Sequence, residues 1–574
     1  MSKFLLLLIM LMPLGVFGQT ITGKVADDSG EPLFGANVYW LETSTGVFTE
    51  EDGSFEIKNE TDKVKLLAAS FVGFEPDTVE VSSNSFITFT LVASKTLQEI
   101  VVESERPGVI ISNIDAIKTE QITSTELRKA ACCDLAGCFE SQLTVQPQTT
   151  NIITNSKELR ILGLSGVYNQ VMIDGFPVIQ GLSYTYGISS VPGTLVDNIF
   201  VAKGANSVLQ GFESISGQIN VTTQPADNSE ILLLNGYINS FGEKQFNANV
   251  SYSGNSWSNL IAVHTTQPAG KTDRDKDSFL DLPLITRYSF EEKFQYRKSS
   301  EWGWSSTVAV KFLNEQRNGG QFDFDAKTDK GSATVYGQSV KFNQPEIRTR
   351  TTYRLDNTHS FTLKASAFTQ NQETYFGITK YDARQNNVYA NLQYALNYGS
   401  TDDFKTGVSY RHLQIDEDIS FLENSLGRTY EGVYSRTEHI PGVFAENTMK
   451  FFDAKLTWIA GLRADHHNQF GWSITPRTLL KWNITPRGVI RANVGTGWRT
   501  VNLFSENINL LVSSRDIIFE EDLNPERAIN YGINYTQKYE TGNLNGYLSI
   551  DFYRTDFQNQ VFPDYDSDPT KAII

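Results

Sequence analysis

The sequence has little of what several other classes of protein depend on. It contains only 3 Cys, 5 Met and 6 His among 574 residues, too few cysteines for a disulfide-stapled scaffold. Acidic residues outnumber basic ones by 66 to 49, and no basic run of the kind that binds phosphates is present, which argues against a nucleic-acid partner. After residue 17 no apolar run approaches the roughly 20 residues of a membrane-spanning helix. What remains, 36 Phe and 24 Tyr with moderate hydrophobicity, favours a large β protein.

The N-terminus has the pattern of a secretion signal. Lys3 precedes an apolar segment over residues 4–16, which is too short to span a membrane comfortably, and small residues follow near Gly18. We expect a signal peptide over residues 1–18, cleaved after Gly18, so that the mature chain lies outside the cytoplasm. The next residue is Gln19 rather than Cys, which disfavours a lipid anchor.

Residues 19–94 predict a small immunoglobulin-like β-sandwich. Short β-prone segments at 21–25, 36–41, 53–57, 64–71, 78–81 and 86–91 are separated by turn sequences. The segment resembles the carboxypeptidase regulatory-like domain through GKV at 23–25, GEPL at 30–33, GANV at 35–38 and DGSF at 52–55. No catalytic site is implied, because the stretch contains no histidine that could bind a zinc ion.

Residues 104–227 predict a mixed α/β domain with many glycines. The stretch 169–177 reads as a strand that enters a tight turn, in which Gly175 supplies the necessary freedom in φ. With segments 160–163, 199–211 and 217–222, it resembles the plug domain of TonB-dependent outer-membrane receptors, and several ordered motifs are a specific signal. The resemblance marks these plug-motif residues: Arg160, Gly163, Asp174, Gly175, Lys203, Gly204, Gly211 and Gly217.

Residues 228–574 alternate apolar and polar side chains, as a transmembrane antiparallel β-barrel must. Phe246, Ala248 and Val250, for example, interleave with Asn247 and Asn249. A helix would need a period of 3.6 residues instead. Segments 474–477, 497–504 and 523–526 are similar to barrel signatures of the same receptors. The whole chain is therefore expected to be dominated by β structure.

The same pattern predicts about fifteen strands. Connections are alternately short and long, with long ones near 267–282, 315–345, 371–384, 416–437 and 500–525, and brief exceptions near 240–243 and 466–470. Plugged barrels use about 22 strands, and the chain ends without a terminal aromatic strand. We therefore expect a C-terminally truncated sequence with a partial barrel; a smaller free-standing barrel is the alternative.

Residues 95–103 lie between the sandwich and the plug. In the receptors that the chain resembles, this position holds the TonB box, which adds as a strand to TonB through main-chain hydrogen bonds. The resemblance implies TonB binding by Leu97, Gln98, Glu99, Ile100, Val101 and Val102. A last strand of the sandwich, with no partner, is the alternative.

Two groups of residues could bind metal ions. Cys132, Cys133 and Cys138 crowd one stretch of the plug, and thiols bind soft metals, although a packed helix or one disulfide explains them more simply. Asp273, Asp275, Asp277 and Asp281 follow a D-x-D-x-D-x-x-x-D pattern in a predicted extracellular loop, and such carboxylates can bind Ca²⁺. The glycine expected at the turn is missing, so a solvated acidic loop remains the alternative.

The resemblance implies import across the outer membrane of a scarce ligand, gated by the plug and driven by TonB with its inner-membrane motor. It also implies insertion into outer-membrane lipid by the barrel-assembly machinery, with the N-terminal domain in the periplasm. An iron–siderophore or other metal complex is the favoured ligand; cobalamin and glycans stay open. No cofactor is required, and the sequence shows no catalytic motif or phosphate loop, so the chain is not expected to be an enzyme. An adhesin or structural barrel without energy coupling is the alternative.

Overall fold

The protein consists of two compact units, residues 1–105 and 106–574. The computed structural model describes residues 19–27, 30, 32–33, 36–40, 46–50, 52–59, 66–71, 77–81, 86–91, 109–111, 117–123, 126–127, 134–227, 229–297, 302–398, 402–541 and 544–574. The predicted signal peptide, the predicted TonB-binding residues 97–102, Cys132 and Cys133 lie outside these described residues.

The first unit has the two packed sheets of a sandwich. One sheet has the strand order β4-β1-β7 and the other β3-β2-β5-β6. The strands are β1 (Gln19–Asp27), β2 (Asn37–Trp40), β3 (Gly46–Phe48), β4 (Ser54–Asn59), β5 (Leu66–Ser70), β6 (Asp77–Glu80) and β7 (Ile87–Leu91). Alternate side chains such as Val38, Trp40 and Phe89 are buried between the sheets. The sequence pattern located six of these strands and missed β3, which is too short to show an alternation.

The plug forms the first part of the second unit. Its main sheet has the order β12-β14-β13-β9-β8, and β10 pairs with β11 in a hairpin. The strands are β8 (Val109–Ile111), β9 (Thr119–Ile122), β10 (Val145–Asn151), β11 (Ser156–Ile161), β12 (Asn169–Ile173), β13 (Val196–Lys203) and β14 (Gly217–Thr223). Among the described residues of the plug, helical structure comprises Glu126 and Leu127, α2 (Leu182–Gly187) and short 3₁₀ turns, including η2 (Gly166–Tyr168). No helix in the described parts of the chain is long and apolar enough to cross a membrane.

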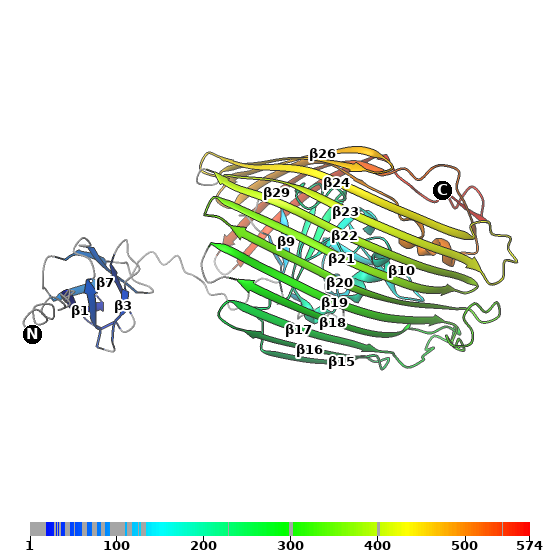
Figure 1. Ribbon diagram of the computed structural model, residues 1–574, viewed down its shortest axis with the longest axis horizontal. Coiled ribbons are helices and arrows are strands. Elements are labelled where there is room, and N and C mark those ends of the chain that lie inside the picture. The colour runs from blue at the N-terminus through cyan, green and yellow to red at the C-terminus, as the bar shows by residue number, and fades with distance from the viewer. Residues whose placement is uncertain are drawn as a thin grey trace, which may run out of the picture. The chain divides into compact units, whose positions relative to one another are not determined.

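Most of the remaining described residues of the second unit form one antiparallel sheet of fifteen strands in sequence order (Figure 1). This number confirms the sequence prediction. The strands are β15 (Leu232–Ile238), β16 (Lys244–Ser253), β17 (Trp257–Gln267), β18 (Leu284–Arg297), β19 (Gly303–Gly320), β20 (Gly337–Arg354), β21 (His359–Phe376), β22 (Thr379–Tyr398), β23 (Asp402–Phe421), β24 (Gly432–Phe451), β25 (Leu456–His467), β26 (Gly471–Thr485), β27 (Gly488–Arg499), β29 (Glu526–Thr541) and β30 (Leu544–Asn559).

This sheet buries its polar face and exposes its apolar one. On β16, Phe246 is 48 % exposed and Val250 40 %, whereas Asn247 and Asn249 are 3 % and 5 % exposed. A water-soluble sheet has the opposite arrangement, because apolar burial drives its folding. The predicted membrane-barrel alternation is therefore present in space as well as in sequence.

The sheet curves around the plug. Polar contacts with the plug come from Asn249 of β16, Arg317 of β19, Arg411 of β23, Arg477 of β26 and Asp551 of β30. These strands are distributed across the sheet from its second strand to its last. The plug therefore lies on the inner side of the curved sheet, where Figure 1 shows it behind the strands.

Several connections are shorter than the sequence predicted. The long connection expected at 371–384 is wrong, since β21 and β22 pair as far as Phe376 and Thr379 and leave only two residues between them. The strands likewise continue into the predicted loops 315–345 and 416–437. Most of their outward side chains there are polar, which removes the apolar alternation although the hydrogen-bond ladder continues. We refer to the strand ends that carry these longer connections as the long-loop end of the sheet. The opposite strand ends, which carry the short turns, are the short-turn end.

Candidate functional site

A cluster of four charges joins the plug to strand β30. Lys118 Nζ lies 2.8 Å from both carboxylate oxygens of Asp551, and Lys203 Nζ lies 3.0 Å from Asp551 Oδ2 and 3.4 Å from Glu120 Oε1. The side chains are largely buried. Burial lowers the pKa of Lys203, but Glu120 and Asp551 outweigh it, so the pKa lies above its usual value. Lys203 was singled out by its motif; its barrel partner was not.

The turn at Asp174 and Gly175 contacts the opposite wall. Both residues have positive φ, +52° and +79°, which explains the glycine. Asp174 Oδ2 lies 3.2 Å from Lys293 Nζ of β18 and 3.3 Å from Arg348 Nη1 of β20, and Oδ1 accepts from the Thr223 amide at 2.8 Å. Burial raises the pKa of Asp174, but Lys293 and Arg348 outweigh it and hold the pKa below its usual range.

Gly204 lies directly against the barrel wall. Its φ is +73°, and a Cβ atom there would lie 2.5 Å from Asn530 Oδ1 and 2.9 Å from Asn493 Nδ2. Gly163 has nearly the same φ, +75°, but open space around it. Backbone conformation therefore favours glycine at both positions, and the close approach of the barrel adds a second reason at Gly204 only.

The other plug-motif residues make contacts within the plug. Arg160 Nε donates to Glu158 Oε1 at 2.6 Å. A Cβ atom at Gly211 would meet Gln170, and one at Gly217 would lie 2.7 Å from a backbone carbonyl. These residues shape the plug and do not form a common site.

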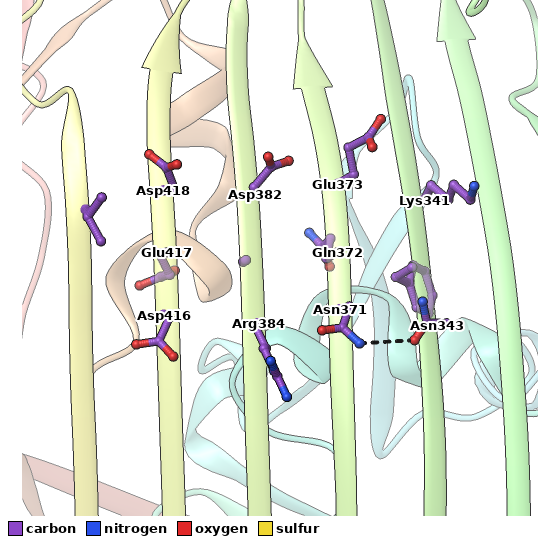
Figure 2. Close-up of a pocket in the computed structure, with 13 residues that line it drawn as sticks. Lys341, Asn343, Asn371, Gln372, Glu373, Asp382, Arg384, Asp416, Glu417 and Asp418 are labelled. Atoms are coloured by element: carbon purple, nitrogen blue, oxygen red, sulfur yellow. Dashed lines mark hydrogen bonds between the residues drawn. The ribbon is translucent and has the colours of Figure 1, made fainter.

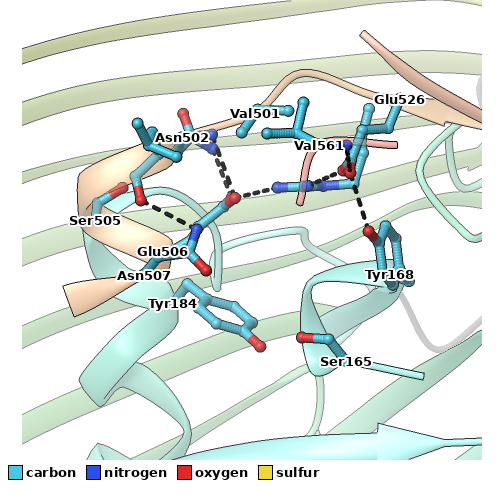
Figure 3. Close-up of polar contacts among 12 residues, drawn as sticks. Ser165, Tyr168, Tyr184, Val501, Asn502, Ser505, Glu506, Asn507, Glu526 and Val561 are labelled. Atoms are coloured by element: carbon cyan, nitrogen blue, oxygen red, sulfur yellow. Dashed lines mark hydrogen bonds and ion pairs between the residues drawn. The ribbon is translucent and has the colours of Figure 1, made fainter. Parts of the chain in front are cut away.

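A buried network at the long-loop end connects the plug, two strands and a loop (Figure 3). Arg499, at the end of β27, forms ion pairs with Glu526 of β29 and with Glu506. The hydroxyl of Tyr168 in η2 donates to Glu526 Oε1 at 2.9 Å. Burial, together with the charge of Glu526, raises the pKa of Tyr168, so this hydroxyl stays protonated and donates. The amide of Val561 donates to the same carboxylate oxygen at 2.9 Å.

Between the plug and the wall, next to this network, lies a cavity of about 30 Å³. Gln170 and Gln180 of the plug, with Arg411, Arg499 and Glu506, are among its lining residues. This volume suffices for about one water molecule. It cannot hold a nutrient or a chelate in this arrangement.

A larger hollow, of about 450 Å³, lies on the outward face of β20–β24 (Figure 2). Its exposed side chains form rows in direct cross-strand register: Lys341 faces Glu373, which faces Asp382, which faces Asp418. The alternate residues, such as Phe342, are buried on the plug side. The hollow is therefore a polar surface of the wall and not a passage beside the plug.

The predicted metal ligands are brought together only in part. Ligand atoms of Asp273, Asp275 and Asp277 lie within 4.8 Å of one another. Asp281 is not in that group, and its carboxylate accepts from the Arg274 amide at 3.1 and 3.2 Å. The prediction that this loop binds Ca²⁺ stays a prediction. Cys138 is buried, and its thiol donates to the carbonyl oxygen of Asp134.

Comparison with known families decides what this plugged sheet is. The sequence profile of the TonB dependent receptor-like β-barrel matches residues 251–572, more than half of the chain. The plug domain of TonB-dependent receptors matches residues 113–218, and the CarboxypepD_reg-like domain matches residues 21–102. The chain belongs to the TonB-dependent receptors. Membership of this family carries with it an outer-membrane β-barrel, and the family is one of receptors and transporters rather than enzymes.

Two curated receptors are similar to part of this receptor. TonB-dependent receptor SusC of Bacteroides thetaiotaomicron is 26 % identical over 245 residues, which cover 40 % of this chain and 24 % of SusC. TonB-dependent receptor P39 of Formosa agariphila is 26 % identical over 214 residues, 36 % of this chain and 19 % of P39. The matched regions thus span a quarter or less of these relatives.

Solved structures share the fold of this receptor. FpvA of P. aeruginosa superposes with a TM-score of 0.63 at 13 % identity, covering 84 % of this chain and 70 % of FpvA. The ferric yersiniabactin uptake receptor FyuA from Yersinia pestis gives a TM-score of 0.59 at 14 % identity, covering 77 % and 72 %. At such identities the likeness concerns the fold alone.

Sequence reasoning found the plug motifs of this receptor but missed the residues that hold the plug. Asp551, Arg499, Glu506 and Glu526 contact groups that are up to several hundred residues away in sequence. One weak signal was available for two of them: Arg499 is the last residue of β27 and Glu526 the first residue of β29, so each is a charged residue at a strand end.

Proposed function

We propose that this receptor imports a scarce small ligand, an iron–siderophore or other metal complex, across the outer membrane with energy supplied by TonB. The observation that carries this proposal is a plug domain seated inside a sheet whose outward face is apolar, in a chain that belongs to the TonB-dependent receptors. A plug inside a wall has to yield before anything passes, so the passage has to be gated.

In this proposal the short-turn end faces the periplasm, with the N-terminal sandwich there, and the long-loop end faces the outside. TonB binds the segment 97–102 as an added strand and pulls on the plug. The plug is held by ion pairs and hydrogen bonds such as those at Asp551 and Asp174. Such contacts are individually modest and can re-form, which suits a plug that has to return after each cycle.

The test is growth of a strain that depends on this receptor, on limiting iron chelates, copper, cobalamin or oligosaccharides in turn. Ile100→Pro removes a main-chain donor that strand addition needs, whereas Ile100→Ala removes only side-chain atoms. We expect the proline variant to fail on one nutrient and the alanine variant to grow like the parent.

The nutrient that separates the variants identifies the ligand class, and separation on an oligosaccharide alone would replace the metal-complex proposal. Equal growth of both variants on every nutrient, with both proteins present in the outer membrane, would contradict energy coupling through this segment. The adhesin alternative would then be favoured.

A further inference from the structure

The connection between β27 and β29, residues 500–525, folds down onto the plug. It contains α3 (Leu503–Glu506), α4 (Ile508–Val512) and the short strand β28 (Asp516–Ile518). Its apolar side chains are buried with those of plug helix α2 and of neighbouring loops; the cluster includes Leu182, Tyr186, Tyr430, Leu503, Phe504, Ile508, Leu510, Leu511 and Ile517. We refer to residues 503–512 as the cap.

Few polar contacts fasten the cap to the plug itself. The hydroxyl of Thr185 in α2 donates to the Ser505 carbonyl at 2.6 Å, and Asn509 Nδ2 donates to the Thr150 carbonyl at 2.9 Å. Both are neutral hydrogen bonds, each of which contributes modestly. The strongest polar contact of the cap is therefore the ion pair of Glu506 with Arg499.

The two carboxylates that pair with Arg499 are held in different ways. Glu526, the other partner of Arg499, belongs to a barrel strand and is held in addition by Tyr168 and by the amide of Val561. Glu506 belongs to the cap, where it also accepts from Asn502 Nδ2 at 2.7 Å. If the cap lifts, Arg499 keeps the carboxylate of Glu526, and Glu506 moves into water.

This matters because a buried charge without a partner is costly. The side chains of Arg499 and Glu506 are only 6 % and 7 % exposed. Separating the two would be prohibitive if Arg499 had a single partner. With Glu526 fixed beside it, the separation leaves the buried guanidinium paired.

The segment that follows the cap in sequence is held by neighbouring loops at the long-loop end. Asp516 of β28 accepts from the Thr429 amide at 2.6 Å, and β28 pairs in parallel with β31 (Lys571–Ile573). The other side joins β27 at Arg499. The chain is thus held on both sides of the cap, at β27 and at β28. The cap lies over a cavity with room for about one water molecule.

We propose that the cap is the gate through which a ligand reaches the plug from the long-loop end, and that Glu506 and Arg499 are the positioning residues that keep it shut. This inference rests on the proposed import function. In the closed arrangement the cap occupies the space above α2, so a ligand has to displace it. Lifting the cap breaks one ion pair, with Arg499 still neutralised, and also exposes apolar side chains such as Leu510 and Leu511, whose burial the ligand has to replace.

Hydrogen–deuterium exchange of the purified full-length receptor in detergent, without ligand or TonB, tests the gate. Amides of Glu506, Asn507, Leu510 and Ser513 donate to carbonyl oxygens in the cap or directly beside it, so their exchange reports its opening. Glu506→Gln is expected to speed their exchange about tenfold, because a charged hydrogen bond becomes a neutral one. Glu521→Gln, which removes an exposed carboxylate from the same connection, is the matched control and is expected to change nothing.

Two results would overturn the inference. One is equal exchange of the cap in the two variants. The other is an equal rise in the amides of β27 and β29, which would mean that Glu506 merely supports the wall. Glu506→Asp, which keeps the charge, is expected to restore part of the protection. Because neither ligand nor TonB takes part, a negative result leaves the import proposal standing, and failure of the growth test leaves this measurement valid.

Discussion

Lys118, just before the plug strand β9, donates to both carboxylate oxygens of Asp551 in the barrel strand β30, at 2.8 Å each. Lys203 shares the same carboxylate. Glu120 lies 3.8 Å from Lys118 and 3.4 Å from Lys203. If β9 leaves the plug sheet, the cluster divides into two neutral pairs, Lys118 with Glu120 and Lys203 with Asp551. No buried charge is left without a partner at this boundary.

Asp551→Asn should therefore weaken the hold on the first plug strands. A tether inserted between residues 104 and 105 allows them to be pulled from the short-turn end in a force measurement. Loss of the buried pair removes about 3 kcal/mol, so the first rupture is expected at lower force. Asp556→Asn is the control, because Asp556 pairs with Arg554 on the exposed face of the same strand. Equal rupture forces in the two variants would contradict a role for Asp551.

Gly204→Ala and Gly163→Ala separate backbone strain from the fit of the plug in the barrel. Both glycines have φ near +74°, so each alanine costs about 1 kcal/mol of strain. Only at residue 204 does the added methyl group meet the wall, at Asn530. We expect Gly204→Ala to lower the melting temperature more than Gly163→Ala does. Similar shifts in melting temperature would mean that the plug and the wall accommodate the methyl group at residue 204 without loss of stability.

Asp174→Asn tests the ion pairs on the opposite wall. Asparagine tolerates the positive φ at this position, so the change removes charge without new strain. At pH 7 we expect a loss of about 2 kcal/mol, because Lys293 and Arg348 lose a charged acceptor.

The pH dependence of that loss follows from the lowered pKa of Asp174. A carboxyl group whose pKa in the folded protein lies below its ordinary 3.8 stabilises fully above that value and loses its effect as the pH falls through the lowered pKa. The difference between the parent and Asp174→Asn should stay constant from pH 7 to about 5 and shrink only below about 4. Thermal unfolding at these pH values measures it, and a difference that vanishes already at pH 6 would assign the effect to another group.

Calcium titration tests the acidic loop between β17 and β18. If Asp273, Asp275 and Asp277 bind Ca²⁺, isothermal titration should give a Kd of about 0.1–1 mM, typical of extracellular sites. Asp275→Asn should abolish the heat. Asp281→Asn should leave it unchanged, because Asp281 lies outside the group. Binding that depends on Asp281 would contradict the arrangement in the structure.

The sequence predictions succeeded where a feature depends on residues that are neighbours in the chain, and they failed where it depends on contacts between distant residues. The alternation at Phe246 to Val250 and the turn at Asp174 and Gly175 depend on neighbouring residues, and both were predicted. Outward Glu373 and Asp382 have the polar character of a loop, and only their pairing across β21 and β22 shows that the strands continue. Asp281 ends the same D-x-D-x-D-x-x-x-D pattern, but its carboxylate accepts from the Arg274 amide instead.

The sequence by itself determined the three-part organisation, the fifteen strands and the family, because periodicity and turn motifs are written in consecutive residues. Only the tertiary structure decided which charges hold the plug and which loop covers it. Lys118 meets Asp551, and Tyr168 meets Glu526, across more than 350 intervening residues. A buried charge needs a partner, but any of many charged residues could supply it. The choice is made by the curvature of the sheet around the plug, which no local pattern contains.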